Sequence, residues 1–579
     1  MADNNTFDAI VVGSGISGGW AAKELTERGL NTIMLERGFD IKHGKDYEAS
    51  NKPVWEYPHR GGRTQQMIAD YPHLKRDYPL NERNLHYWAS DKDNPYTETK
   101  RFDWFRGYHV GGRSLMWGRQ SYRWSETDFE ANAKDGHGTD WPIRYKDIEP
   151  WYTHVEKFAG IQGSYENLPF LPDSHFLPAM ELNIVEKDAA AKIKAHYNNK
   201  RTLIIGRTAH VTGPLGHSPQ RTNCQYRDMC WNGCPFGAYF STQSSTLPAA
   251  MATGKLTLGI NSIVKEIIYD KDTKKAKGVR VIDAETMQTK DYFSKIVFLC
   301  ASAFNSAWIL MNSATDIWPD GLGSSSGELG HNAMDHHFRV GASGEVEGYD
   351  DKYYFGHRPT GFYIPRFRNS GDDKRDYVRS FGYQGGASRN GWGREVAELS
   401  VGAELKDALS EPGGWRIGAT AFGEMLPYHD NKISLDKNYY DEKGQITDSG
   451  KGKQKTDKWG LPVLNMDVAI GENEKKMRVD MQNDMKEMLE IVGAKNVNGY
   501  ENDYAPGMGI HEMGTARMGR DAKNSVLNGN NQVWDCKNVF VTDGACMAST
   551  ACVNPSLTYM ALTARAAAFA VDELKKLNV

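Results

Sequence analysis

The sequence lacks the features that mark membrane, exported or nucleic-acid-binding proteins. No run of about 18 apolar residues occurs, so no membrane-spanning helix is predicted. The first residues, MADNNTFDAIVVG, contain neither the basic nor the apolar segment of a secretory signal. Acidic and basic residues nearly balance, with a net charge of −4, so the chain has no basic field for nucleic acid or an anionic membrane. We therefore expect a soluble protein that binds neither and has no export signal of its own.

Cysteine is also scarce, with seven in 579 residues, yet three of the seven fall within eleven residues. A secreted disulfide framework would spread an even number of cysteines over many loops, so this pattern argues against that class. Three neighbouring thiols cannot all pair with one another. Either one stays free, one has a distant partner, or all three hold one soft metal or iron–sulfur cluster. The three are Cys224, Cys230 and Cys234, and the other four are expected to be buried packing residues: Cys300, Cys536, Cys546 and Cys552.

The N-terminal segment has the pattern of a nucleotide-binding strand, turn and helix. Residues 7–12 form an apolar run that predicts a buried parallel strand, and residues 20–28 predict a helix. Three glycines between them have the G-x-G-x-x-G spacing: Gly13, Gly15 and Gly18. Such glycines allow a tight turn and a close approach to a pyrophosphate, which the helix N-terminus then binds. Glu36 ends the next apolar run, where it can accept hydrogen bonds from ribose hydroxyls; the alternative is a glycine-rich helix start without a ligand.

Four further segments carry motifs in a fixed order along the chain. They are YHVGGRSLMWGRQSYRW (108–124), IVFLCASAFNSAWILMNSA (296–314), GIHEMGTARMG (509–519) and a segment over 538–574 that contains VTDG and VNPS. Together with the N-terminal unit they resemble the glucose–methanol–choline (GMC) family of flavin oxidoreductases. The resemblance implies an α/β fold in which a discontinuous Rossmann-like FAD-binding domain carries an inserted α+β substrate-binding domain. It also implies FAD as the dinucleotide.

The expected domain division follows the positions of these motifs. Residues 1–335 are predicted to form the FAD-binding domain with the cysteine loop, 336–500 the substrate-binding domain, and 501–579 the return to the FAD-binding domain. Within the middle segment, 361–367 predicts a strand and 472–492 predicts a helix.

The resemblance also assigns roles to individual residues. His511 corresponds to the family's histidine that faces the flavin, and Asn554 to the second polar side chain there. An imidazole can accept a proton from an alcohol near neutral pH, whereas an asparagine binds the hydroxyl without titrating. For His511 the alternative is a structural histidine, and for Asp543 an ordinary helix cap. The other residues implied in FAD binding are Gly111, Gly112, Ser114 and Asp543.

One position departs from a pattern in the family. Some sugar-oxidising relatives have a histidine, bonded covalently to the flavin, where this chain has Met116. A thioether cannot form that bond, so FAD is expected to be bound non-covalently.

The three clustered cysteines, followed by Pro235, resemble the loop of bacterial FAD-dependent sugar dehydrogenases that holds a [3Fe-4S] cluster. That resemblance implies a cluster at Cys224, Cys230 and Cys234. The alternatives are a zinc site completed by His210 or His217, or a loop of free thiols. A flavin with a cluster implies a dehydrogenase that passes electrons to another protein.

The function implied is that of a glucoside 3-dehydrogenase, which oxidises the C3 hydroxyl of a glucoside or disaccharide to a 3-keto sugar. The alternatives are a glucose or gluconate dehydrogenase acting at C1 or C2, an oxygen-using sugar oxidase, or a flavin-binding scaffold that only relays electrons. Cluster-bearing relatives work in the periplasm with a small export subunit and pass electrons to a cytochrome c. The same arrangement is expected here, with a cytoplasmic location if no such subunit exists.

Overall fold

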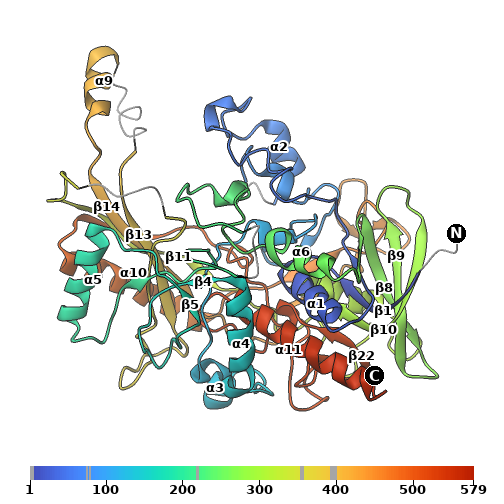
Figure 1. Cartoon of the computed structure of the whole chain (residues 1–579). Coiled ribbons are helices and arrows are strands. Elements are labelled where there is room, and N and C mark those ends of the chain that lie inside the picture. Colours follow the sequence, from blue (N-terminus) through green and yellow to red (C-terminus); the bar gives the residue numbers. More distant parts are fainter. Residues whose placement is uncertain are drawn as a thin grey trace.

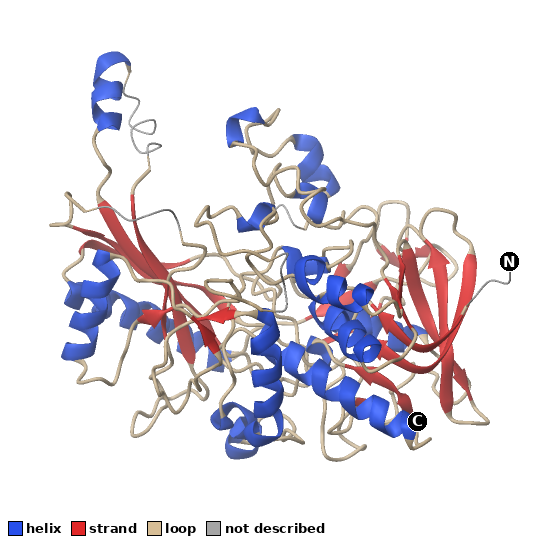
Figure 2. Ribbon diagram, viewed as in Figure 1, coloured by secondary structure: helices blue, strands red, loops and turns tan. Residues whose placement is uncertain are grey.

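The computed structural model describes the chain from residue 5 to residue 579, except for 74, 75, 77, 79, 217–220, 353–357 and 392–400. Two large β-sheets lie toward opposite sides of the molecule, with helices against both (Figure 1). Long loops fill the space between them (Figure 2). This mixed α/β architecture confirms the predicted fold class.

The first sheet joins strands from the two ends of the chain and from the middle. β10 (Thr289–Leu299) lies between β1 (Thr6–Val12) and β22 (Cys536–Val541), and both of its neighbours run parallel to it. The strand order is β21-β22-β10-β1-β2-β7, with β9 and β8 added as an antiparallel extension of β10. The remaining strands of this sheet are β2 (Thr32–Leu35), β7 (Leu256–Gly259), β8 (Ser262–Asp270), β9 (Lys275–Asp283) and β21 (Gln532–Val533).

The predicted strand–turn–helix unit forms at the centre of this sheet. β1 covers the predicted 7–12 run and β2 ends one residue before Glu36. The helix α1 (Ile16–Glu27) packs against α11 (Ser556–Lys575), but it begins four residues earlier than predicted. The glycines in the first turn of α1 do not shift the start of the helix to a later residue. A Cβ at Gly18 would lie 1.9 Å from the Gly13 carbonyl oxygen, so this glycine allows the helix to begin directly against the turn.

The second sheet has six antiparallel strands in the order β20-β11-β14-β13-β12-β6. These are β6 (Ile204–Ile205), β11 (His337–Val346), β12 (Phe362–Ile364), β13 (Phe381–Arg389), β14 (Trp415–Gly423) and β20 (Lys495–Glu501). α10 (Glu472–Val492) packs on β11 and β14, and both the predicted 472–492 helix and the strand within 361–367 are confirmed. α10 buries a stripe of methionines at helical spacing: Met477, Met481, Met485 and Met488. The predicted division at residues 335 and 500 stays a prediction.

Shorter elements connect the two sheets. The other helices are α2 (Gln65–Asp70), α3 (Glu126–Asp135), α4 (Tyr145–Ala159), α5 (Ile184–His196), α6 (Leu247–Ala252), α7 (Ala303–Asn312) and α9 (Gly402–Ser410). The short strands are β3 (Thr97–Glu98), β4 (Ile161–Gln162), β5 (Phe176–Leu177), β15 (Lys432–Leu435), β16 (Tyr439–Tyr440), β17 (Ile446–Thr447), β18 (Lys453–Gln454) and β19 (Leu464–Asp467).

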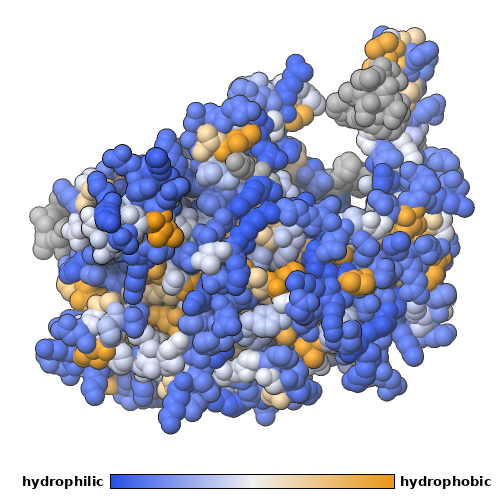
Figure 3. All heavy atoms as spheres, turned by 180° about the vertical axis from the view of Figure 1, so that it is seen from behind, coloured by the Kyte–Doolittle hydropathy of each residue, from blue (hydrophilic) through white to orange (hydrophobic). Residues whose placement is uncertain are grey.

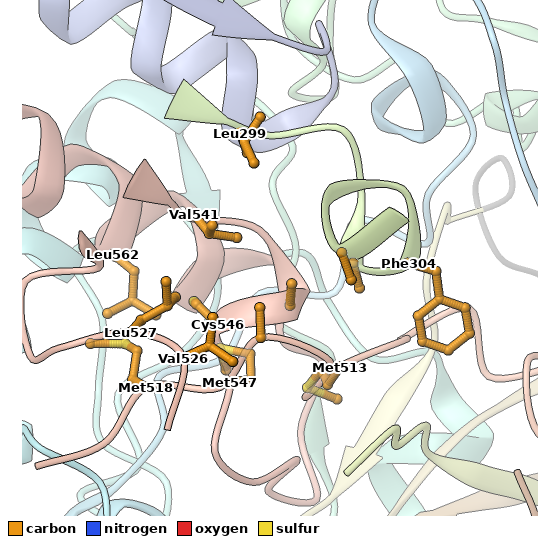
Figure 4. Close-up of a cluster of buried hydrophobic side chains, with 14 of the residues drawn as sticks. Leu299, Phe304, Met513, Met518, Val526, Leu527, Val541, Cys546, Met547 and Leu562 are labelled. Carbon is orange, nitrogen blue, oxygen red and sulfur yellow. The ribbon is translucent and has the colours of Figure 1, made fainter. Parts of the chain in front are cut away.

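The largest hydrophobic core fastens the C-terminal segments to the first sheet. Figure 4 shows Leu299 of β10 and Val541 of β22 above a cluster that includes Cys546 and Leu562. All four cysteines predicted to be packing residues are buried, which confirms that expectation. Burying one large apolar side chain, such as that of Leu299 or Leu562, stabilises the fold by about 1.5–3 kcal/mol. The C-terminal segments are therefore packed into the core of the first sheet.

The surface is predominantly polar. On the face shown in Figure 3, hydrophobic residues form small separate patches among hydrophilic ones. In the described parts of the chain, every helix is too short or too polar to cross a membrane.

Candidate active site

A cavity of about 330 Å³ lies where the loops of the first sheet meet the second sheet. Gln384 of β13 and Phe422 of β14 supply its wall from the second sheet. The other lining residues come from separated stretches of the chain, namely 12–17, 35–37, 105–120, 262–264, 300–309, 509–512 and 543–559, together with Tyr78, Trp88 and Trp231. All the segments that carry the sequence motifs therefore meet at one cavity.

The N-terminal glycine turn forms one end of this cavity. Gly13 follows β1 with φ +91°, a left-handed conformation that favours glycine. A Cβ on Gly15 would meet no atom within 4 Å, because this position faces open space at the N-terminus of α1. The helix start directs its free N–H groups and its positive dipole end there. The turn thus provides a cradle for a pyrophosphate.

Glu36 lies at the same end of the cavity. Its carboxylate accepts hydrogen bonds from Ser14 Oγ (2.5 Å), Ser14 N (3.1 Å) and Gly38 N (3.0 Å). Burial raises the pKa of Glu36, and these hydrogen bonds oppose that shift. Glu36 therefore holds the turn in place and lines the cavity, while its predicted contact with a ribose stays a prediction.

The second glycine segment is tied to the first. Gly111 (φ +86°) and Gly112 (φ +47°) are left-handed, and the Gly111 N–H donates to Ser14 Oγ at 2.8 Å. Ser114 Oγ donates to the Gly111 carbonyl at 2.6 Å and accepts from the Thr242 N–H at 3.0 Å. Ser14 was not among the predicted site residues, although its hydroxyl links both glycine segments. Its place inside the G-x-G motif was the only sequence signal.

Asp543 serves as a cap in the cavity wall. Its carboxylate accepts from the Ala545 N–H (3.0 Å) at the start of a short 3₁₀ helix, Gly544–Cys546, and from Ser306 Oγ (2.5 Å). Burial raises its pKa to about 6. The capping alternative therefore describes its contacts, while its predicted role in FAD binding stays a prediction.

His511 and Asn554 face each other in this cavity. The Asn554 Nδ2 and His511 Nε2 atoms are 3.3 Å apart, although the residues belong to different loops. Asn554 Oδ1 accepts a hydrogen bond from Gln384 Nε2 at 2.7 Å. The backbone N–H of His511 donates to Asp335 Oδ1 at 3.0 Å, and this hydrogen bond fixes the loop that carries His511. The structure thus brings together the two residues predicted to be catalytic.

Burial decides the charge of His511. Burial lowers the pKa of His511 well below its usual value, and the neighbouring His336 and Arg113 lower it further. The imidazole is therefore neutral near pH 7, with a lone pair available on one ring nitrogen. That is the form a general base requires.

Three contacts around His511 were missed by the sequence reasoning. His336 Nδ1 lies 2.8 Å from His511 Nδ1, and Asp335 also accepts hydrogen bonds from the Gly507 and Gly509 N–H groups. Glu512 pairs with Arg113 through two bonds of 2.9 and 2.6 Å. The only signal in the sequence was the pair of adjacent histidines in the run Asp335–His337, which the structure shows to be buried.

Comparison with family models decides the family. The N-terminal GMC oxidoreductase model matches residues 7–338 and the C-terminal GMC oxidoreductase model matches residues 441–563. The chain is a GMC oxidoreductase. Enzymes of this family bind FAD, and the glycine cradle, the helix N-terminus and the open position at Gly15 fit the pyrophosphate of that cofactor.

Curated relatives of this GMC oxidoreductase include alcohol and sugar dehydrogenases. It is 27% identical to 2-methyl-1,2-propanediol dehydrogenase of Mycolicibacterium austroafricanum, over 96% of this chain and 94% of that protein. It is 24% identical to the fructose dehydrogenase large subunit of Gluconobacter japonicus, over 98% of both chains. It is also 25% identical to the gluconate 2-dehydrogenase flavoprotein of Pantoea cypripedii, over 96% of this chain and 92% of that one.

Solved structures share the fold. Pyridoxine 4-oxidase from Mesorbium loti matches with a TM-score of 0.58 at 14% identity, covering 97% of this chain and 98% of the other. A formate oxidase variant of Aspergillus oryzae RIB40 matches with a TM-score of 0.57 at 13% identity, covering both chains fully.

Met116 of this GMC oxidoreductase is buried in the wall of the main cavity. The position at which some relatives form the covalent flavin bond therefore faces the cavity. Because its side chain is a thioether, non-covalent binding of FAD stays the prediction.

The clustered cysteines lie in a separate, smaller cavity of about 20 Å³, lined by Cys224, Cys230, Cys234 and His210. All three thiols are free, and the nearest histidine contact is 3.8 Å, between Cys230 Sγ and His210 Nε2. Within the described residues, no three His, Cys, Asp or Glu side chains are grouped so that they could hold a metal ion. The predicted [3Fe-4S] cluster is therefore not supported by this geometry, and neither is the zinc alternative with His210. His217 lies outside the described residues.

Arg119 lies between the two cavities in this oxidoreductase. Its guanidinium packs on the rings of Trp231 (5.6 Å) and Tyr239 (5.0 Å), and its backbone is left-handed with φ +60°. The side chain lines the main cavity, yet its Nε and Nη1 atoms have no hydrogen-bond partner among the described residues. Arg119 thus places a buried guanidinium at the wall of the main cavity.

Proposed function

We propose that this protein is an FAD-dependent sugar dehydrogenase that oxidises a secondary alcohol, the C3 hydroxyl of a glucoside or disaccharide, to a ketone. The observation that carries the proposal is the His511–Asn554 pair, 3.3 Å apart in the cavity wall. The names of two relatives, a fructose dehydrogenase and a gluconate 2-dehydrogenase, support a polyhydroxylated substrate.

The proposed chemistry divides between the cofactor and the side chains. FAD, when bound, supplies the acceptor for the hydride that leaves the carbinol carbon. His511 Nε2 accepts the hydroxyl proton, because burial keeps the imidazole neutral. Asn554 Nδ2 donates a hydrogen bond to the hydroxyl oxygen, and Gln384 holds the amide in that orientation. Together these two groups align the hydroxyl for loss of its proton.

The cavity wall supports a sugar as substrate. Trp231, Phe422 and Trp88 offer aromatic faces, and Gln120 and Gln384 offer amide hydrogen-bonding groups. Sugars are commonly bound by such a combination of apolar faces and polar groups. The choice of C3 comes from the sequence resemblance alone.

Arg119 favours a second candidate, a sugar acid such as gluconate oxidised at C2. An unpaired guanidinium in the cavity wall matches a substrate carboxylate, which arginine binds through two parallel hydrogen bonds. The name of the relative from Pantoea cypripedii supports the same substrate class.

One experiment separates these candidates. The FAD-loaded enzyme is mixed anaerobically with methyl glucosides, disaccharides, glucose, gluconate and 1,2-propanediol, flavin bleaching is followed, and products are identified by NMR. A 3-keto glucoside supports the first proposal, whereas a 2-keto acid formed from gluconate supports the second. Bleaching by none of the sugars contradicts both.

We also propose that Cys224, Cys230 and Cys234 acquire a [3Fe-4S] cluster in the mature protein. The described side chains are not grouped to hold a metal, so the proposal rests on the sequence resemblance, on the three thiols lining one cavity, and on two buried arginines beside them, Arg119 and Arg221. Burial lowers the pKa of Arg221 to about 9, and the Cys234 thiol opposes that shift. An anionic cluster would offset this positive charge. Iron and sulfide analysis with EPR of the oxidised protein tests the proposal, and zinc without iron contradicts it.

We propose further that the protein works with a small export subunit and passes electrons to a cytochrome c in the periplasm. Support comes from the name of one relative, which is the large subunit of a dehydrogenase. Fractionation of native cells, with affinity capture and a cytochrome c reduction assay, tests this arrangement. A purely cytoplasmic protein without a co-purifying subunit contradicts it.

A further inference from the structure

Four side chains and one backbone carbonyl form a continuous chain through the candidate active site. Gln384 Nε2 lies 2.7 Å from Asn554 Oδ1, and Asn554 Nδ2 lies 3.3 Å from His511 Nε2. His511 Nδ1 lies 2.8 Å from His336 Nδ1, and His336 Nε2 lies 2.7 Å from the Ala551 carbonyl oxygen. His511 therefore has a polar neighbour at each of its ring nitrogens.

The hydrogen bond between His336 and the Ala551 carbonyl determines which ring nitrogen of each histidine carries the proton. The Ala551 carbonyl can only accept, so His336 must carry a proton on Nε2. In a neutral imidazole the other nitrogen is then bare, so His336 Nδ1 accepts. Two bare nitrogens cannot form a hydrogen bond, and His511 must therefore carry its proton on Nδ1. Its Nε2 is left with a lone pair that faces the cavity.

The contacts of Asn554 and Gln384, at the other end of this series of hydrogen bonds, agree with the assignment. Because Gln384 Nε2 donates to Asn554 Oδ1, the NH₂ group of Asn554 is the one that faces His511. An NH₂ group only donates, so it requires a lone pair on His511 Nε2. The two ends of this series of hydrogen bonds thus specify the same tautomer of His511.

Burial keeps both imidazoles neutral, as the assignment requires. It lowers the pKa of His336 to about 4 and that of His511 well below its usual value. The backbone N–H of His511 donates to Asp335, and Arg113, which also lowers the pKa of His511, is itself paired with Glu512.

The backbone at both histidine contacts is held in an unusual conformation. Ala551, whose carbonyl ends the chain, has φ +53°, and Ile510, directly before His511, has φ +59°. Residues with a Cβ rarely adopt this region, and such strain clusters at functional sites. Here it aims the terminal carbonyl at His336 and sets the start of the His511 loop.

We infer that His336 is a positioning residue that holds His511 in the Nδ1–H tautomer and so keeps Nε2 free to take the substrate proton. The inference rests on the proposed role of His511 as the base. In the other tautomer, an N–H would face both the Asn554 amide and the substrate hydroxyl. The hydroxyl oxygen could then only accept hydrogen bonds from these two N–H groups, and no lone pair on His511 would be available to remove its proton.

Two substitutions at one position test the inference. His336→Gln keeps a group that can reach Ala551 but moves its acceptor away from His511, whereas His336→Asn keeps an acceptor at the position of Nδ1. His337 is also buried and adjacent, and its ring has no hydrogen bond to His336 or His511 among the described residues, so His337→Gln is the matched control. FAD content and the circular dichroism spectrum are compared first.

The readouts are flavin reduction by sugar in anaerobic stopped flow and ¹⁵N NMR of histidine-labelled protein. We expect His336→Gln to slow reduction by roughly 10–100-fold, as loss of a supporting partner of a functional histidine does. His336→Asn should recover much of the rate, and His337→Gln should retain it. The His511 Nε2 resonance, assigned with His511→Ala, should lie in the unprotonated range in the parent and leave it in His336→Gln.

A double variant separates this inference from the proposed function. If His336 acts only through His511, His511→Ala with His336→Gln should be no slower than His511→Ala alone. A normal rate in His511→Ala contradicts the proposed base and the inference together. If His511→Ala is slow but His336→Gln keeps the parent rate and the parent ¹⁵N spectrum, the inference about His336 is overturned while the proposed base stands.

Discussion

Arg113 and Glu512 form a two-pronged ion pair, with bonds of 2.9 and 2.6 Å, that joins the second glycine segment to the loop of His511. The Glu512 side chain is almost fully buried, with 1% of its surface exposed. The pair therefore connects the predicted FAD-binding segment directly to the predicted base. Its planar geometry is one that arginine provides and lysine does not.

Breaking this pair should destabilise the fold. Arg113→Met leaves the Glu512 carboxylate buried without its partner, which typically costs about 3–5 kcal/mol of unfolding free energy. Urea denaturation of the two proteins measures the difference. As a control, Lys475→Met removes the exposed pair between Lys475 and Glu472, which contributes little to stability because solvent screens it. Equal effects of the two substitutions would contradict the importance assigned to the buried pair.

Removing the proposed base should separate binding from chemistry. His511→Ala should retain FAD, because the glycine cradle is untouched, but should slow flavin reduction by sugar by roughly 10²–10⁴-fold. Asn554→Ala should also slow it through loss of the hydrogen bond to the hydroxyl. Anaerobic stopped flow measures both rates. Reduction of His511→Ala at the parent rate would show that another group takes the proton.

Stability should fall in mild acid because histidines are buried uncharged. Burial lowers the pKa of His109 to about 4, below the value of about 6.5 expected in the unfolded chain. Between these values the unfolded state binds more protons than the folded state, so stability rises with pH and is lost as pH falls from 6.5 toward 4.

One such histidine contributes up to about 1.4 kcal/mol for each pH unit in that window. His109→Gln should therefore flatten the dependence of unfolding free energy on pH between 4 and 6.5, measured by urea denaturation at several pH values. His137→Gln, at an exposed position, is the matched control and should leave the slope unchanged. A slope that His109→Gln does not alter would contradict this account.

The cysteine loop should lose its metal when one thiol is removed. If the proposed cluster exists, Cys230→Ser should contain FAD but little iron and no EPR signal of the oxidised cluster. Cys536→Ser, which changes a buried packing cysteine, should retain both cofactors. Metal analysis and EPR of the three proteins check this, and a parent protein without iron would leave the loop as a set of free thiols.

FAD should leave the denatured protein. Because Met116 faces the cavity where a linking histidine would be needed, acid precipitation should release yellow FAD into the supernatant. Absorbance of the supernatant and pellet measures the partition. Flavin that stays in the washed pellet would reveal a covalent bond to another residue.

The sequence was most informative where structure depends on neighbouring residues. The β1–turn–α1 unit and α10 follow from apolar periodicity and glycine spacing, which are local properties. His336 and Gln384 were missed because their partners lie 175 and 170 residues away along the chain, and no local pattern specifies such contacts. The cysteine spacing indicated that the three thiols would be neighbours, but side-chain geometry decides whether they can hold a metal.

The position of β22 beside β10 also has a consequence for how the molecule is made. β10 pairs with β1 through residues synthesised early, yet its other edge at Val297–Leu299 waits for a strand more than 200 residues later. Until residues 536–575 emerge from the ribosome, that edge is open, α1 lacks its neighbour α11, and Asn554 is missing from the site. Unpaired edges of this kind attract other chains. A nascent chain stalled before β22 would therefore expose an unpaired strand edge at which it could aggregate with other chains.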